Sequence, residues 1–188
     1  KAVYGKKNNL PVSCLSIADT LLGELYKHNP KARVIGLGGD HSVSYPFVKN
    51  WIKNQKDQNF AVIHFDAHTD LLPSRLGIPI CFGSWAYHIL KLLPTPKNLI
   101  QIGIRSSGKN KKHWESTLGI KQIWAKEVKQ KGIEKLYKEI SLSLRKLNVK
   151  NIYISFDIDA LDSLFASATG TPEKEGLALH EAISLIRD

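Results

Sequence analysis

Short apolar runs alternate with helical patterns along this 188-residue chain, and this alternation limits the possible fold more than any other feature. Strands that are apolar at nearly every position are typical of a parallel sheet covered on both faces. The runs expected to form strands are Arg33–Leu37, Phe60–Phe65, Leu99–Ile104, Ile152–Phe156 and, more weakly, Lys121–Ala125.

Between these runs, apolar residues recur at intervals of three and four, the spacing of an amphipathic helix. The helices expected are Leu15–Tyr26, Val43–Ile52, Trp85–Leu92 and Ile133–Leu147. Alternation of strands and helices favours right-handed crossovers and a doubly wound α/β sheet. The sequence contains no repeat or linker, so residues 1–188 are expected to form a single domain.

Composition argues against several classes of protein. No stretch approaches the ~18–20 uninterrupted apolar residues of a membrane span, and no apolar signal region follows the N-terminal lysines. Cys14 and Cys81 are far apart in sequence with apolar neighbours, which indicates reduced, buried cysteines in a cytoplasmic protein. The net charge of +10 comes largely from lysines spread over helix-like segments, and no nucleic-acid-binding module is recognisable. We therefore expect neither a membrane nor a nucleic-acid partner.

Acidic residues and histidines appear where three of the apolar runs end. The three segments are Gly38–Ser42, Asp66–Asp70 and Ser155–Asp159. Active sites in open α/β sheets form outside the carboxyl ends of the strands, so the three segments are expected to meet at one rim. Each motif alone has a simpler explanation, such as a turn after a strand, but their joint occurrence favours a shared site. A dinucleotide-binding pattern is not completed, because His41 takes the place of its third glycine.

Side chains two residues apart in extended backbone point the same way, so these segments can present several ligands to one pocket. The candidate metal ligands are His41, Asp66, His68, Asp70, Asp157 and Asp159. Four carboxylates gathered without cations would repel one another and raise one another's pKa values. A divalent metal removes that repulsion, and oxygen-rich ligation with two histidines suits Mn²⁺ better than structural zinc.

In these segments the sequence resembles the arginase–agmatinase (ureohydrolase) family. Gly38–Ser42, Asp66–Asp70 and Ser155–Asp162 are similar to its three metal-binding motifs, and Ala168–Pro172 to the segment that follows the third. The resemblance implies a three-layer α/β/α fold with a mainly parallel sheet. It also implies that N- and C-terminal parts of the family fold lie outside these residues, which agrees with a composition that lacks methionine.

The resemblance further implies a hydrolase that cleaves a small guanidino compound to urea and an amine with two Mn²⁺ ions. Asp66 and Asp157 would bridge the ions, and a hydroxide between them would attack the guanidinium carbon. The remaining ligands would divide into two sites, His41 with Asp70 and His68 with Asp159. Asp70 would also relay the proton of the hydroxide to the departing amine.

Other positions depart from the arginase pattern. Leu72 replaces an asparagine that holds the substrate carboxylate, and Ser106–Gly108 replaces aspartates that bind the substrate amino group. The substrate is therefore not necessarily L-arginine, although Thr171, in the segment after the third motif, is expected to bind it. The proton-shuttle histidine is also missing. His88 could replace it, or could be a partly buried helix residue, and His64 is most simply a core residue.

A second interpretation is a truncated or degenerate homologue that binds metal without catalysis or stabilises an oligomer. The complete ligand set argues against it, because buried carboxylates without a cation would be costly. The family resemblance also implies a homo-oligomer, either a trimer or a hexamer.

Overall fold

The computed structural model describes residues 6–7, 10–11 and 13–187. The chain divides into two compact units, which are described separately. Residues 1–58 and 70–93 form one unit, called here the helical unit, and residues 59–69 and 94–188 form the other, called the sheet unit. The expectation of a single domain stays a prediction.

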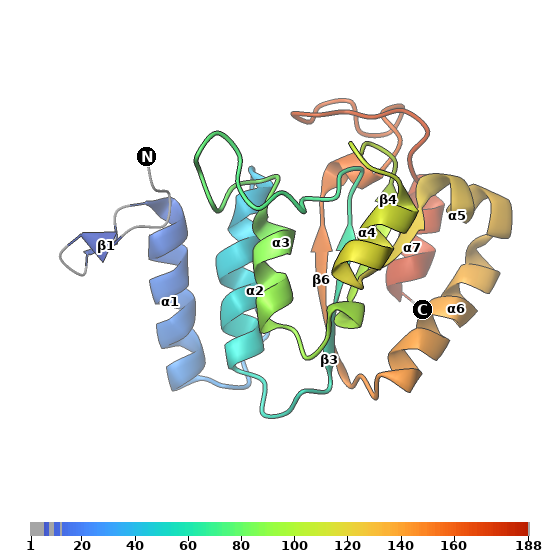
Figure 1. Ribbon diagram of the computed structural model, residues 1–188. Coiled ribbons are helices and arrows are strands. Elements are labelled where there is room, and N and C mark those ends of the chain that lie inside the picture. Colours follow the sequence, from blue (N-terminus) through green and yellow to red (C-terminus); the bar gives the residue numbers. More distant parts are fainter. Residues whose placement is uncertain (1–5, 8–9, 12, 188) are drawn as a thin grey trace. The chain divides into compact units, whose positions relative to one another are not determined.

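The helical unit contains two short strands and three helices, and in Figure 1 its helices α1 and α2 run side by side. Its elements are β1 (Lys6–Lys7), β2 (Leu10–Pro11), α1 (Cys14–His28), a 3-10 turn (His41–Val43), α2 (Ser44–Lys53), α3 (Trp85–Ile89) and a second 3-10 turn (Leu90–Leu92). Ser13 begins α1, because its hydroxyl accepts a hydrogen bond from the amide of Ser16. The carboxylate of Asp19 then joins α1 to α2 by accepting from Lys49 and Asn50, each at 2.7 Å.

The sheet unit is built on four parallel strands in the order β5-β4-β3-β6. Their bounds are Phe60–Phe65 for β3, Leu99–Ile104 for β4, Lys121–Trp124 for β5 and Asn151–Phe156 for β6. All four match strands predicted from the apolar runs. Every residue of β3 and β4, the two central strands, is buried, as the uninterrupted apolar pattern predicts.

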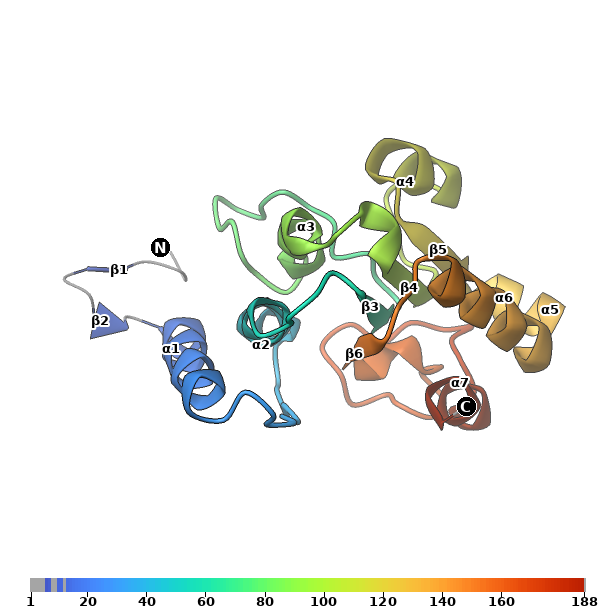
Figure 2. The same cartoon turned by 90° about the horizontal axis from the view of Figure 1, so that it is seen from below.

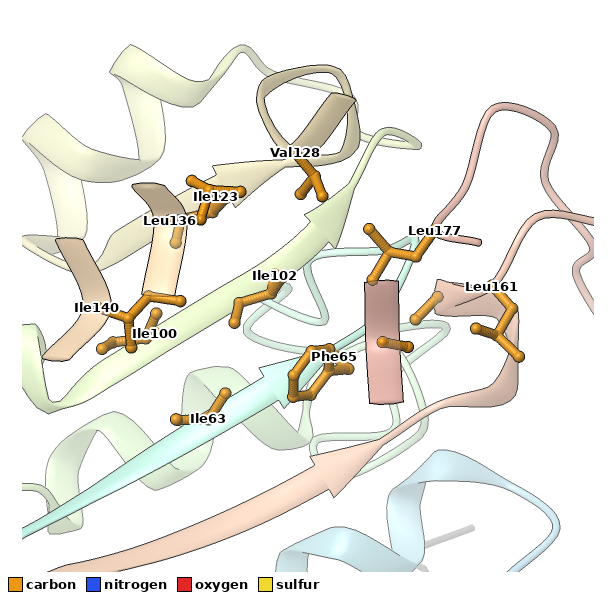
Figure 3. Packing of buried hydrophobic residues seen from close by; sticks show 12 residues of the cluster. Ile63, Phe65, Ile100, Ile102, Ile123, Val128, Leu136, Ile140, Leu161 and Leu177 are labelled. Atoms are coloured by element: carbon orange, nitrogen blue, oxygen red, sulfur yellow. The ribbon is translucent and has the colours of Figure 1, made fainter. Parts of the chain in front are cut away.

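The helices of the sheet unit are α4 (Lys111–Leu118), α5 (Ala125–Lys131), α6 (Ile133–Lys146) and α7 (Leu179–Arg187), with 3-10 turns at Pro96–Asn98 and Ile158–Ala160. Figure 2 shows α5, α6 and α7 on one side of the sheet. Their apolar residues pack onto Ile63, Ile100 and Ile102 of the central strands (Figure 3). Full burial of each such side chain contributes about 1.5–3 kcal/mol, so this layer stabilises the strands whose ends carry the candidate ligands.

Two expectations about local structure need correction. Arg33–Leu37 belongs to no helix or strand, so the predicted strand before the first motif is wrong. Its apolar pattern alone could not form a ladder, which requires a neighbouring strand to supply hydrogen bonds. Cys14 and Cys81 are free thiols, but Cys14 is exposed on α1 and Cys81 is half-buried, so the expectation that both are buried is wrong. Within the described residues, no helix combines the length and apolar character needed to cross a membrane.

Candidate metal-binding site

Asp66 follows the last residue of β3, and the backbone there still belongs to the sheet. Its amide donates to the carbonyl of Ile102 on β4 at 3.1 Å, which fixes the point where the side chain leaves the strand. The carboxylate is 2% exposed. Its Oδ1 accepts from the amide of His68 at 2.6 Å, and its Oδ2 lies 2.8 Å from Nε2 of His64. The segment after β3 is therefore folded around this carboxylate.

Asp157 follows β6 in the same way. Phe65 and Phe156 are register partners at the ends of β3 and β6, and the amide of Asp157 donates to the carbonyl of Phe65 at 2.9 Å. The carboxylate of Asp157 accepts from the amide of Asp159 at 3.0 Å and so begins the 3-10 turn Ile158–Ala160. That turn carries Asp159 back toward the end of β3.

The structure brings Asp66, His68 and Asp159 together, with one ligand atom from each within 4.8 Å of the others. Oδ2 of Asp159 lies 3.1 Å from Nδ1 of His68, and Oδ1 accepts from the amide of Ala67 at 3.1 Å. Thr171 Oγ1 donates to the same Oδ2 at 3.0 Å. Two carboxylates and an imidazole from two strand ends therefore lie close enough to bind one cation.

Burial and neighbouring charges shift the pKa values of two groups in this cluster. Burial raises the pKa of Asp159, the hydrogen bond with His68 opposes this shift, and repulsion from Asp66 and Asp157 raises the pKa further. The hydrogen bonds of His68 with Asp159 and Asp66 raise the pKa of its imidazole to about 10. A protonated His68 thus offsets part of the negative charge, which is the task that a bound cation would perform.

The helical unit holds the other two candidate ligands, His41 and Asp70. Nδ1 of His41 lies 3.2 Å from Oδ2 of Asp70, and both side chains are less than 10% exposed. Asp70 has a φ of +52°, a left-handed conformation that is uncommon for residues other than glycine. The amide of Tyr87 donates to its carbonyl at 3.2 Å and helps to hold this backbone in place. Asp40, which precedes His41, caps the 3-10 turn by accepting from the amide of Ser42 at 2.8 Å.

His88 lies on α3 and is partly buried. Its Nε2 lies 3.0 Å from the carbonyl of Pro73, and its ring contacts Tyr45 and Tyr87 edge-on. Its role as a proton shuttle stays a prediction. The same holds for substrate binding by Thr171, whose hydroxyl is engaged with Asp159.

Two residues at the site were not singled out from the sequence. The indole nitrogen of Trp85, which is fully buried, donates to Oδ2 of Asp70 at 2.7 Å. A buried tryptophan needs an acceptor for its N–H, so this residue close after the second motif was a usable signal.

Arg105, directly after β4, donates to six backbone carbonyls, those of Gly103, Asp159, Ala160, Leu161, Glu173 and Lys174. It therefore fixes the backbone on both sides of the segment that contains Thr171.

Comparisons with known proteins place the chain in a family. A family model described as "Arginase family" matches residues 7–188. The human mitochondrial guanidino acid hydrolase is 35% identical over 154 residues, which cover 80% of this chain and 42% of that protein. The agmatinase of Bacillus anthracis is 36% identical over 152 residues, which cover 81% of this chain and 48% of that protein. The chain thus spans about half the length of these relatives.

Among solved structures, proclavaminate amidino hydrolase from Streptomyces clavuligerus superimposes with a TM-score of 0.79 at 27% identity. The match covers 98% of this chain and 60% of that one. It confirms the expected three-layer α/β class with a mainly parallel sheet.

Proposed function

The chain belongs to the arginase family, and on this premise we propose that it forms the metal-binding core of a hydrolase that cleaves a guanidino compound to urea and an amine. The observation that carries the proposal is the convergence of Asp66, His68 and Asp159 at the carboxyl ends of neighbouring strands. The relatives named guanidino acid hydrolase and agmatinase support the substrate class.

We propose that two Mn²⁺ ions are bound by the six ligands expected from the sequence. The set is His41, Asp66, His68, Asp70, Asp157 and Asp159. Its chemistry fits, because four carboxylates and two imidazoles give the oxygen-rich ligation that Mn²⁺ accepts. The pKa of Asp159, raised first by burial and then by repulsion from Asp66 and Asp157, supports the same proposal, since a cation would stabilise the charged carboxylate. When bound, the cations would act as Lewis acids and lower the pKa of water toward neutrality.

The protein groups around the ligands would then handle the proton. Trp85 holds Oδ2 of Asp70 through a charge-assisted hydrogen bond of 2.7 Å, so this carboxylate is kept in one orientation. Asp70 would accept the proton of the attacking water and pass it to the amine as the carbon–nitrogen bond breaks. We keep His88 as a candidate for exchanging that proton with solvent, and Thr171 as a substrate contact.

We propose that the substrate differs from L-arginine at the end opposite the guanidino group, where L-arginine carries its α-amino and carboxylate groups. Leu72 is 44% exposed and apolar, and Ser106 and Ser107 carry no charge with which to bind an α-amino group. Each missing charge-assisted hydrogen bond would cost about 1.5–3 kcal/mol, which lowers kcat/KM for L-arginine by orders of magnitude. Compounds with a guanidino group but without the α-amino acid are therefore favoured.

The test is release of urea by the full-length protein loaded with manganese. Agmatine, 4-guanidinobutanoate and L-arginine would be compared, and Asp159→Asn would serve as the inactive control. We expect urea from at least one of the first two compounds and little from L-arginine. A protein that binds two manganese ions and releases no urea from any guanidino compound would instead be the non-catalytic homologue.

Assembly and location are separate predictions. A homotrimer or hexamer is expected from the family, and sedimentation velocity of the full-length protein would distinguish the two. We propose a cytoplasmic location from the two free cysteines, which favour a reducing compartment. Fractionation of the source cells would test it.

A further inference from the structure

A row of polar side chains crosses the central strands of the sheet unit. His64, Gln101 and Gln122 are register partners on β3, β4 and β5, and each is 0% exposed. Their chain neighbours Ile63 and Ile102 point to the opposite, apolar face, where the helices pack. Burial of three polar groups is costly unless each is hydrogen-bonded, so their arrangement calls for an explanation.

The row forms an unbroken chain of hydrogen bonds that ends on a candidate metal ligand. Trp124 Nε1 donates to Oε1 of Gln122 at 3.0 Å, and Nε2 of Gln122 donates to Oε1 of Gln101 at 2.8 Å. Nε2 of Gln101 lies 2.9 Å from Nδ1 of His64, and Nε2 of His64 lies 2.8 Å from Oδ2 of Asp66.

Two contacts determine which atom donates and which accepts in each hydrogen bond of this series. The indole N–H of Trp124 can only donate, so it determines which end of the Gln122 amide faces it. Gln101 Nε2 also lies 2.6 Å from the carbonyl oxygen of Thr69, which can only accept, so the Gln101 amide is oriented independently. Nδ1 of His64 must therefore accept, and the ring proton must be on Nε2, where it donates to Asp66.

We propose that His64 is a positioning residue for Asp66, and that the chain from Trp124 through Gln122 and Gln101 fixes the Nε2–H tautomer with which His64 does so. This inference rests on the proposed function in that Asp66 is taken as a metal ligand. A carboxylate has about four acceptor sites, so a hydrogen bond from His64 is compatible with metal ligation. The bond restrains the carboxylate before a cation arrives, as groups behind metal ligands commonly do.

The tautomer can be measured in the metal-free protein by two-bond ¹H–¹⁵N NMR of histidine-labelled protein. We expect His64 to show a protonated Nε2 and an unprotonated Nδ1, with the exposed His28 as the internal reference. A protonated Nδ1 would overturn the inference. This readout does not depend on catalysis, so an inactive protein with the expected tautomer would refute the proposed function alone.

Substitutions of His64 test the effect on metal binding. The amide nitrogen of Gln can take the place of Nε2 of His, so His64→Gln keeps the donor and His64→Phe removes it. We expect His64→Phe to weaken manganese binding about 10–100-fold, the usual effect of losing a group behind a ligand. His64→Gln should stay within about threefold of wild type. Equal losses in both folded variants would show that the ring matters for packing only.

Gln101→Met tests whether the hydrogen bonds beyond His64 contribute. Methionine keeps the length of the side chain but cannot donate a hydrogen bond. In the protein that keeps His64, we expect this change to lower manganese affinity about tenfold and both tautomers of His64 to appear. In the His64→Gln background the same change should have little effect on affinity, because no tautomer remains to be fixed. Gln130→Met, on the exposed face of α5, is the matched control. Additive losses in the two backgrounds would overturn the proposed role of the chain.

Discussion

Thr171 donates a hydrogen bond of 3.0 Å to Oδ2 of Asp159, the oxygen that also lies 3.1 Å from Nδ1 of His68. The hydroxyl thus acts on a candidate metal ligand from a segment twelve residues further along the chain. The segment Ala168–Pro172 therefore orients a candidate metal ligand, in addition to the substrate contact proposed for Thr171.

Replacement of Thr171 should therefore affect metal binding. We expect Thr171→Val to weaken manganese binding several-fold, because a hydrogen bond to a charged group contributes about 1.5–3 kcal/mol and this one is partly open to solvent. Thr171→Ser keeps the hydroxyl and should bind manganese as the wild type does. Isothermal titration calorimetry checks both. An unchanged affinity in the valine variant, with a raised KM, would assign Thr171 to substrate binding alone.

Manganese binding should release a proton from His68. The pKa of this imidazole is raised to about 10 in the metal-free protein, above its ordinary 6.5. The protonated His68 therefore stabilises the folded, metal-free protein fully below pH 6.5, and this contribution is lost as the pH rises through about 10. A cation requires the neutral ring, so between pH 7 and 9 we expect release of about one proton from His68 and an affinity that rises with pH. Calorimetry at pH 8 in buffers of different ionisation enthalpy measures the number of protons released on manganese binding. A value of zero would contradict the assignment of His68 as a metal ligand.

Asp157 and Asp162 offer a paired test of the bridging role. Asp157→Asn should lose both manganese ions and urea release, because one bridging ligand serves two cations. Asp162 is a turn residue that accepts from the amides of Leu164 and Gly176 at 2.9 Å each. Asp162→Asn should therefore lower stability by no more than about 1 kcal/mol and keep the metal. Retention of two tightly bound ions and near-normal activity in Asp157→Asn would show that the bridging assignment is wrong.

Gly176 should be intolerant of any side chain. A Cβ at this position would lie 2.5 Å from Nη2 of Arg105 and 2.5 Å from the backbone nitrogen of Asp162. The backbone must shift to admit it, at a cost of about 1–3 kcal/mol. Gly170→Ala is the matched control, since nothing lies within 4 Å of the added atom there. Urea-induced unfolding of the two variants should differ by that amount, and equal midpoints would contradict the close packing described.

The strands of the sheet could be predicted from the sequence better than the loops and helices around them. Phe60–Phe65 and Leu99–Ile104 were recognisable because their apolar pattern reflects burial on both faces. Arg33–Leu37 carries a similar pattern and forms no strand, since a pattern does not reveal whether a neighbour supplies hydrogen bonds. Helix α4 was missed because none of its residues is buried, although Asn110 and Gly119 mark its two ends.

The candidate ligands were recognisable because metal chemistry restricts residue type and spacing. Of the groups that orient them, Trp85 carried a usable signal, whereas His64 did not, because its partner is distant in sequence. His64 and Gln101 are separated by 37 positions, and only the register of β3 and β4 makes them neighbours. Trp85 and Asp70 are closer in sequence, yet the left-handed backbone of Asp70 that directs its carboxylate has no signature in the residue itself.

The carbonyls that Arg105 binds have a consequence for local unfolding. They belong to the end of β4, the turn that carries Asp159, and the loop at Glu173 and Lys174, so one guanidinium closes three stretches of backbone at once. Because opening of any one stretch breaks part of this shared network, we expect the three to open as a single cooperative unit. In native-state hydrogen exchange, the amides of Asp162 and Leu177, which pair with Leu177 and Ala160, should then exchange with one common free energy of opening. Arg105→Lys should lower that free energy for both amides together while leaving the amides of β3 and β4 protected.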